Sequence, residues 1–147
     1  MTPPILHHAR DLLARYDVVL CDIWGVVHDG RDAYAAAGEA LANFRAAGGT
    51  VILVSNVPVP ALGVEDVLRK TRVRRDAWDA IVAGGDIALE HVAEKGYRRL
   101  HWIGPYKRDR ALFDKAPGAS VPIEEAEAIL CSGLVDDLNE TVEDYRP

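Results

Sequence analysis

Residues 17–27 read Asp17-Val18-Val19-Leu20-Cys21-Asp22-Ile23-Trp24-Gly25-Val26-Val27, a nearly continuous apolar run that contains a carboxylate followed by a glycine. Such a run is long enough to be buried on both faces, as the strands of parallel sheets are. A carboxylate at the carboxyl end of such a strand lies in the crevice where open α/β sheets bind their ligands. Asp22 is therefore a candidate nucleophile or metal ligand.

Four more apolar runs follow, at residues 50–55, 80–83, 99–104 and 126–131. Segments with helical character precede and separate them: residues 5–16, residues 33–47, a segment that carries Leu62, Val67 and Leu68, a segment that follows Gly84-Gly85-Asp86 and ends at Gly96, and residues 107–114. This alternation predicts βαβ units with right-handed crossovers. The expected fold is α/β, a Rossmann-like parallel sheet of about five βα units with helices on both faces.

Two loops are predicted at the carboxyl ends of the first two strands. Residues 24–32 contain the turn signal His28-Asp29-Gly30 and are expected to form a short flap or hairpin. Pro58 and Pro60 prevent a helix from starting directly after the second strand, so residues 55–60 are expected to form a loop.

The composition excludes several classes of partner. The 147 residues carry a net charge of −6, which argues against a nucleic-acid-binding surface and against a polybasic membrane patch. The basic run at residues 69–75 has no interleaved aromatic residues and is interpreted as a solvated helix end. No apolar run approaches the length of a membrane span, and Cys21 and Cys131 lack the spacing of metal ligands. We therefore expect a cytoplasmic protein with reduced thiols.

Polar side chains follow two of the predicted strands, Asp22 after the first and Ser55-Asn56 after the second. Successive parallel strands are commonly neighbours, so these ends should lie side by side. The backbone amides of Gly25 and Asn56 can donate to an anion, and a cation such as Mg²⁺ is needed between that anion and Asp22. This arrangement favours phosphoryl transfer through an aspartyl-phosphate with Asp22 as the nucleophile.

At these residues the chain resembles the haloacid-dehalogenase-like (HAD) hydrolase superfamily. Its first motif, an Asp strand followed by a glycine and a flap, is represented by residues 22–30, and its second, a strand ending in Ser or Thr, by residues 51–56. The segments Gly84-Gly85-Asp86 and Trp102-Ile103-Gly104 look most like subfamily IIA, which includes sugar-phosphatase-like, nucleotide-phosphatase-like and para-nitrophenyl-phosphatase-like members. The resemblance covers essentially the whole chain after the first helix.

The resemblance implies a role for each matching position. Asp22 matches the nucleophile, which is also a Mg²⁺ ligand, and Trp24 matches the position whose backbone carbonyl binds the metal. Ser55 matches the phosphate-binding hydroxyl, with Asn56 beside it. The implied function is Mg²⁺-dependent hydrolysis of a small phosphorylated metabolite.

The chain departs from the family pattern in two respects. Position 24 is ordinarily a second Asp that serves as general acid and base, a role worth roughly 10²–10⁴-fold in rate, and Trp cannot perform it. The Lys and the acidic pair that complete the family's site follow the cap domain, and no match to them occurs here. We therefore interpret residues 1–133 as the N-terminal part of a HAD-like core and residues 134–147 as an acidic exit segment towards a cap. This chain alone is expected to be inactive.

Several alternatives remain open at this stage. The chain could be a non-catalytic phosphate-binding or regulatory module with a degenerate site. His28 could contact substrate, act as a substitute acid above Asp22 or serve only as a turn residue. If further polypeptide normally covers one side of the Asp22 strand, its exposed edge favours formation of a homo-oligomer.

Overall fold

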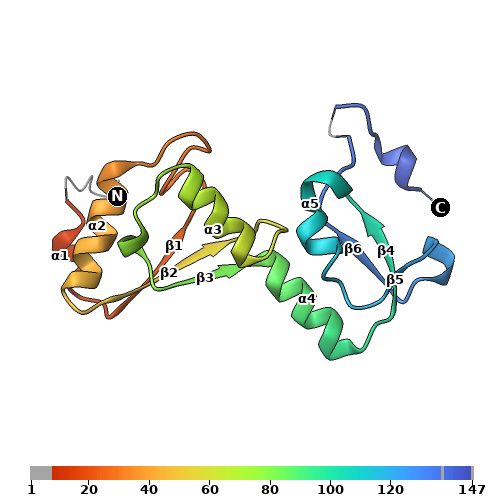
Figure 1. Ribbon diagram of the computed structural model, residues 1–147, viewed down its shortest axis with the longest axis horizontal. Helices are drawn as coiled ribbons and strands as arrows, with labels where there is room; N and C mark the ends of the chain where they lie inside the picture. Colours follow the sequence, from red (N-terminus) through yellow and green to blue (C-terminus); the bar gives the residue numbers. More distant parts are fainter. Residues whose placement is uncertain (1–7, 137, 147) are drawn as a thin grey trace, which may run out of the picture. The chain divides into compact units, whose positions relative to one another are not determined.

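The protein, described by a computed structural model over residues 8–136 and 138–146, folds into two compact units (Figure 1). The first unit comprises the chain up to residue 56 together with residues 61–83. The second comprises residues 57–60 and the chain from residue 84 onward. Each unit contains its own three-stranded parallel sheet, so each is described by itself.

The first unit alternates strands and helices along the chain. Its elements are α1 (Arg10–Leu13), β1 (Val18–Asp22), α2 (Ala35–Ala46), β2 (Thr50–Ser55), α3 (Ala61–Lys70), the short 3-10 helix η1 (Arg75–Ala77) and β3 (Ala80–Ala83). The strands lie in the order β1-β2-β3, and the register aligns Asp22 with Val54 and Ser55 with Ala83. The three strands therefore end at the same edge of the sheet.

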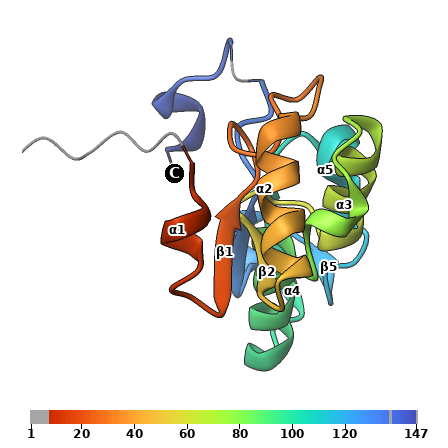
Figure 2. The same ribbon diagram turned by 90° about the vertical axis from the view of Figure 1, so that its left-hand side faces the viewer.

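One face of this sheet carries the core of the first unit. Val51 and Leu53 of β2 are fully buried. Helix α2 contacts β2 (Figure 2), and α3 contacts β3. Side chains that alternate with these lie on the other face, because successive residues of a strand point to opposite sides. Leu20 is 70% exposed and Val18 is 49% exposed on β1, which is an edge strand. The first unit thus has one covered face and one open apolar face.

The second unit is built from α4 (Gly84–Lys95), β4 (Arg99–Ile103), α5 (Tyr106–Phe113), β5 (Ala119–Ser120), η2 (Ile123–Glu125), β6 (Ala128–Cys131) and η3 (Val142–Tyr145). Its strands are parallel in the order β5-β4-β6. The core of this unit is a cluster of buried apolar side chains from α4, α5 and the two longer strands: Val92, Leu100, Leu112, Phe113 and Leu130.

Asp109 is a buried carboxylate that joins α5 to the end of β6. It is 1% exposed, and the helix departs from helical backbone angles at this residue. Its oxygens accept hydrogen bonds from Arg108 Nε at 2.9 Å, Arg108 Nη2 at 2.8 Å and Ser132 Oγ at 2.6 Å. Burial opposes ionisation of Asp109, but these donors outweigh it, so the pKa of the carboxyl lies below its usual value.

The predicted α/β class with parallel strands is confirmed, and the strands at residues 50–55 and 80–83 have the predicted bounds. The pairing differs in one respect: the strands divide between two sheets. Alternation of strands and helices favours pairing of successive strands, but it does not determine where one sheet ends and the next begins. Of the first predicted helix, residues 5–7 lie outside the described residues, and α1 spans only Arg10–Leu13. The two-residue β5 is too short to produce a periodic signal.

The contacts among the described residues divide the chain between residues 83 and 84, whereas the sequence predicts a boundary between residues 133 and 134. The assignment of a core portion and an exit segment stays a prediction. Within the described part of the chain, no helix combines the length and the apolar character needed to cross a membrane. The thiols of Cys21, which is buried, and Cys131, which is exposed, are both free.

Replacing Asp109 by Ala should destabilise the protein by about 1.5–3 kcal/mol, because hydrogen bonds to a buried charged group are lost and Ser132 keeps no equivalent acceptor. Urea unfolding followed by circular dichroism measures the loss. Asp114→Ala is the matched control, since Asp114 pairs with Arg110 of the same helix but is exposed. Asp114→Ala should lower the free energy of unfolding by no more than about 1 kcal/mol. Equal losses of stability in the two variants would contradict the role given to Asp109.

Candidate active site at the carboxyl end of strand β1

Asp22 is the last residue of β1 and is exposed at the edge where the strands of the first sheet end. Among the described residues, none gives its carboxylate a hydrogen bond or an ion pair. A carboxylate in this state can attack or coordinate a ligand without first losing a partner. The position predicted from the sequence for the nucleophile is therefore chemically accessible.

Ser55 ends the neighbouring strand, one residue beyond the residue aligned with Asp22. The pleat places Asp22 on the open face of the sheet and Ser55 on the helix-covered face. Ser55 is half-buried, while the following Asn56 is exposed. Because adjacent strands are only about 4.8 Å apart, a ligand that lies over the edge of the sheet can contact both side chains. The two predicted strand ends are thus brought together.

The flap predicted after β1 is present as a small hairpin-like segment. Isolated bridges join Trp24 to His28 and His28 to Ala33. Gly25 has a φ of 77°, in the left-handed region that favours glycine, and its amide donates to the carbonyl oxygen of His28 at 2.8 Å. That amide is already used within the flap, so its predicted contact with a phosphate requires the bond to be shared or the flap to move.

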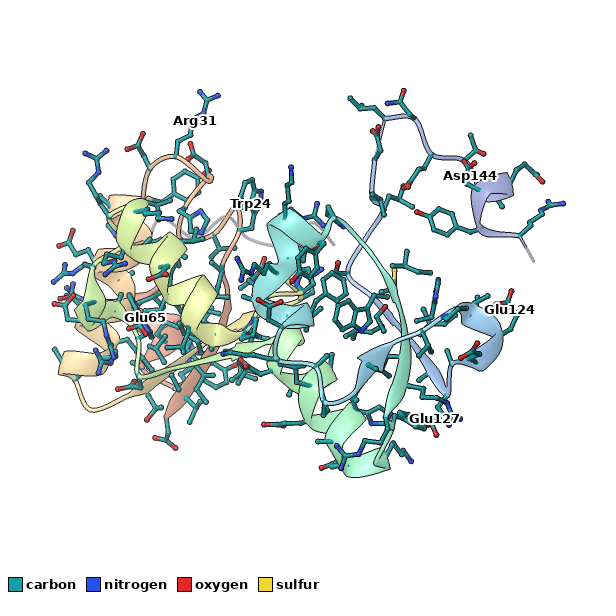
Figure 3. All side chains as sticks on the ribbon, turned by 45° about the vertical axis from the view of Figure 1, so that its right-hand side comes forward. Trp24, Arg31, Glu65, Glu124, Glu127 and Asp144 are labelled. Carbon is teal, nitrogen blue, oxygen red and sulfur yellow. The ribbon has the colours of Figure 1, made fainter. Side chains whose placement is uncertain are left out.

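Trp24, two residues after Asp22, packs on the flap itself (Figure 3). Its indole lies so close to Gly30 that a Cβ at that position would be 2.5 Å from ring atom Cη2. It also makes an edge-to-face contact with the His28 ring, with centroids 5.6 Å apart. The Trp24 side chain nevertheless remains largely accessible, since the residue is 67% exposed. Trp24 therefore stabilises the flap and presents an aromatic surface two residues after Asp22 in the chain.

His28 is a buried part of the flap, only 2% exposed. Its Nδ1 accepts a hydrogen bond from the Gly30 amide at 2.8 Å, which leaves the ring proton on Nε2. Burial lowers the pKa of His28 below its usual value, and the nearby charge of Asp29 only partly opposes this. Among the roles considered for His28, this geometry favours the turn residue over the substitute acid.

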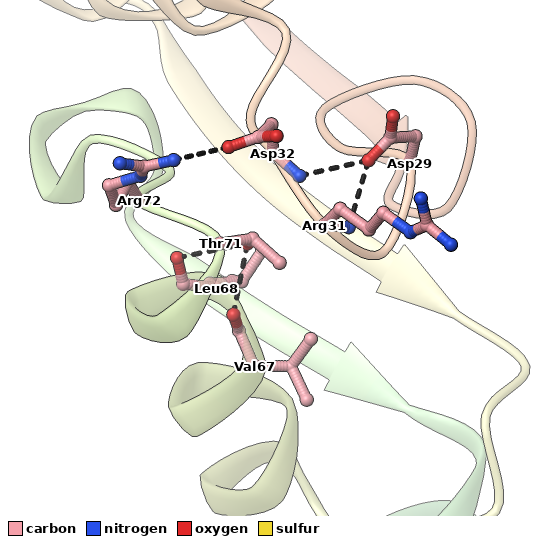
Figure 4. A network of polar contacts seen from close by, with 7 residues as sticks. All are labelled: Asp29, Arg31, Asp32, Val67, Leu68, Thr71 and Arg72. Carbon is pink, nitrogen blue, oxygen red and sulfur yellow. Dashed lines mark hydrogen bonds and ion pairs between the residues drawn. The ribbon is translucent and has the colours of Figure 1, made fainter.

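The far arm of the flap is anchored to the end of α3 (Figure 4). Asp29 Oδ1 accepts hydrogen bonds from the amides of Arg31 at 2.8 Å and Asp32 at 2.9 Å, and these bonds lower the pKa of Asp29. The Asp32 carboxylate forms an ion pair with Arg72. Arg72 follows Thr71, whose hydroxyl donates to the carbonyls that end α3. Sequence reasoning missed this anchor because no local pattern relates residues so far apart in the chain.

The oxygens predicted to hold Mg²⁺ are the Asp22 carboxylate and the main-chain carbonyl of Trp24. Mg²⁺ prefers oxygen ligands and usually combines one or two carboxylates with water and substrate phosphate oxygens. Nowhere in residues 8–136 and 138–146 do three or more His, Cys, Asp or Glu side chains cluster as metal ligands. The residues present therefore fit one side of such a site, and water and phosphate would supply the other ligands.

The segment that contains this site is similar to known hydrolases. Residues 19–116, which include Asp22 and Ser55, match the haloacid dehalogenase-like hydrolase family. A haloacid dehalogenase-like hydrolase from Brucella suis 1330 shares 41% identity and a TM-score of 0.84, over 97% of this chain and 54% of that one. A 4-nitrophenylphosphatase from Thermotoga maritima shares 18% identity and a TM-score of 0.65, over 90% of this chain and 49% of that one.

At 18% identity the second likeness concerns the fold alone. The chain spans about half the length of each of these two structures. No curated protein matches it.

The stability of the protein should fall as the pH decreases below about 6.5, the usual pKa of His. The unfolded chain takes up a proton on His28 there, whereas the folded chain, with its lowered pKa, does not. Uptake of this proton makes the free energy of unfolding fall by about 1.4 kcal/mol more per pH unit. The effect ends where the pH reaches the pKa of His28 in the folded chain. Urea unfolding at several pH values should show a shallower dependence for His28→Asn, whose amide oxygen can still accept from Gly30. The exposed His91→Asn serves as control, and an unchanged slope in His28→Asn would refute the assignment.

Proposed function

The chain belongs to the haloacid dehalogenase-like hydrolase family, and from this premise we propose that it carries the nucleophilic part of a phosphatase-type hydrolase of subfamily IIA. The proposed substrate is a small phosphate ester, the proposed cofactor is Mg²⁺ and the proposed location is the cytoplasm. The observation that supports the proposal most directly is the unpartnered Asp22 carboxylate, among the described residues, at the end of a parallel strand beside the end of the Ser55 strand.

In the first step a carboxylate oxygen of Asp22 forms a bond to phosphorus, and the bond from phosphorus to the leaving oxygen breaks. The leaving oxygen keeps the electron pair of that bond. In the second step water attacks the aspartyl-phosphate, loses a proton to solvent and releases inorganic phosphate, which restores the carboxylate. Splitting the hydrolysis in this way replaces one difficult step with two easier ones.

The remaining site residues orient the phosphate. The Ser55 hydroxyl and the Asn56 amide lie at the same edge and can donate to phosphate oxygens, as can the Gly25 amide when the flap permits it. Mg²⁺, when bound, would neutralise charge between the phosphate and Asp22. An exposed site at a strand end leaves room for these contacts but gives no discrimination by itself between phosphate esters.

Asp22→Asn should lower Mg²⁺-dependent hydrolysis of 4-nitrophenyl phosphate by the complete gene product by at least about 10³-fold, because an amide is not a nucleophile here. Asp17→Asn is the matched control, since Asp17 precedes the opposite end of β1. Release of 4-nitrophenolate measures the rates. Undiminished activity in Asp22→Asn would refute the nucleophile, and phosphate binding without any turnover in the wild type would indicate a non-catalytic binding module instead.

We also propose that this chain, when isolated, forms a homo-oligomer through β1. Among the described residues β1 pairs only with β2, so one side of its backbone is unpaired. The adjoining open face exposes apolar side chains, of which Leu20 is the most exposed on the strand. Unpaired edges flanked by apolar surface favour pairing with another chain.

Leu20→Lys should convert the associated 147-residue chain largely to monomer, because a charge on an edge strand disfavours edge-to-edge pairing. Light scattering after size-exclusion chromatography measures the mass. Leu62→Lys is the control: Leu62 is 68% exposed, close to the 70% of Leu20, but lies on α3. A wild-type monomer at high concentration, or equal effects of the two substitutions, would argue against an interface at β1.

A further inference from the structure

The more basic the leaving group of the proposed reaction is, the more its departure depends on protonation. An alkoxide is about as strong a base as hydroxide, so it departs readily only when an acid protonates it. A phenolate resembles the Tyr side chain, whose pKa is about 10, and electron-withdrawing substituents make it a still better leaving group. Which esters are hydrolysed therefore depends on the proton donors that face the phosphorus.

The residue at the position of the usual acid cannot provide that proton. Trp24 carries an indole N–H, which donates hydrogen bonds but does not ionise in the range where enzymes work. Its ring is held on the flap by contact with Gly30 and His28. Rotation of the side chain would not introduce an acid, because the residue has none.

The other titratable groups of the flap are already engaged in its own structure. The His28 ring is buried and its Nδ1 accepts a hydrogen bond from the Gly30 amide. The Asp29 carboxylate accepts two backbone amides, and the Asp32 carboxylate is paired with Arg72. Among the described residues of the flap, each imidazole and carboxylate therefore has a structural partner that it would have to leave in order to protonate a substrate.

The exposed indole of Trp24 indicates which leaving group suits a site that has no acid at this position. Trp24 lies two residues from the nucleophile and is 67% exposed. Aromatic rings stack on such surfaces with an interaction beyond simple burial. The same residue that leaves the site without an acid thus supplies an apolar surface suited to an aromatic leaving group.

We propose, resting on the function proposed above, that this site is selective for phosphate esters whose leaving group departs as a stabilised aryl-oxide anion, and that it discriminates against alkyl phosphates. The Asp22 oxygen bonds to phosphorus, the bond between phosphorus and the aryl oxygen breaks, and that oxygen leaves with the electron pair. The aryl oxide takes its proton afterwards, from water. None of the described residues of the flap donates a proton in this step.

A leaving-group series tests the proposal in the complete gene product. The kcat/KM values for 4-nitrophenyl, 4-chlorophenyl and phenyl phosphate and for glycerol phosphate are measured with Mg²⁺. The wild type should prefer 4-nitrophenyl over glycerol phosphate by at least about 10³-fold, since general acid catalysis contributes roughly 10²–10⁴-fold. A ratio below about tenfold between these two esters would mean that the absence of an acid makes little difference to the rate. That result would overturn the proposed selectivity.

The variants Trp24→Asp, Trp24→Asn and Trp24→Phe separate the acid from the packing. Trp24→Asp should reduce the ratio of kcat/KM for 4-nitrophenyl phosphate to that for glycerol phosphate by about 10²-fold, because the new carboxyl group is a general acid. Trp24→Phe keeps an aromatic ring and should keep the steep preference. Trp24→Asn gains no acid, so it should lose only the part of the preference that aromatic stacking supplies, about tenfold at most. Equal narrowing in Trp24→Asp and Trp24→Asn would overturn the inference.

Asp22→Asn distinguishes failure of the inference from failure of the function. Hydrolysis that depends on Asp22 but is insensitive to the leaving group would overturn the inference and leave the proposed function standing. Absence of Asp22-dependent hydrolysis for every ester would overturn both.

Discussion

The parallel ladder between β1 and β2 brings together the ends of two strands that are separated in the chain by the flap and the whole of α2. Its register aligns Asp22 with Val54, so the carboxylate and the Ser55 hydroxyl reach the same edge of the sheet. A slip of one residue would move every side chain of β1 to the opposite face. It would bury Leu20 and expose Cys21, and the carboxylate would no longer stand at the open edge. The packing of Val51 and Leu53 against the helices therefore also positions the candidate nucleophile.

The flap that follows β1 is ordered by contacts of several kinds, each weak in itself. The indole of Trp24 covers Gly30, the ring of His28 accepts a backbone hydrogen bond, and Asp32 reaches Arg72 at the end of α3. Exposed ion pairs such as the last contribute little alone. Together they hold in place a segment that would otherwise sample many conformations beside the site. The order of the flap and its lack of an available acid have the same origin, because the groups that could donate protons are the ones that hold it.

The second unit shows how a buried charge can be accommodated away from this site. Asp109 remains ionised inside a small core because three hydrogen bonds compensate its desolvation. The carboxylate links α5 to the residue that follows β6, so its role is structural. Asp22 presents the opposite case, an exposed carboxylate with no partner among the described residues. The contrast between these two residues separates a charge that maintains the fold from one that is available for chemistry.

Local pattern in the sequence determined the strands that end at Asp22 and Ser55, the helix between them, the position of the flap and the absence of an acid at residue 24. These features could be predicted because apolar periodicity and turn residues act over a few neighbouring positions. Only the tertiary structure decided that the strands divide into two sheets, that His28 is buried, that the Gly25 amide is bonded within the flap and that Asp32 meets Arg72. Those outcomes depend on which distant segments pack together, and strand pairing and burial are properties of the whole folded chain that no short stretch of residues encodes.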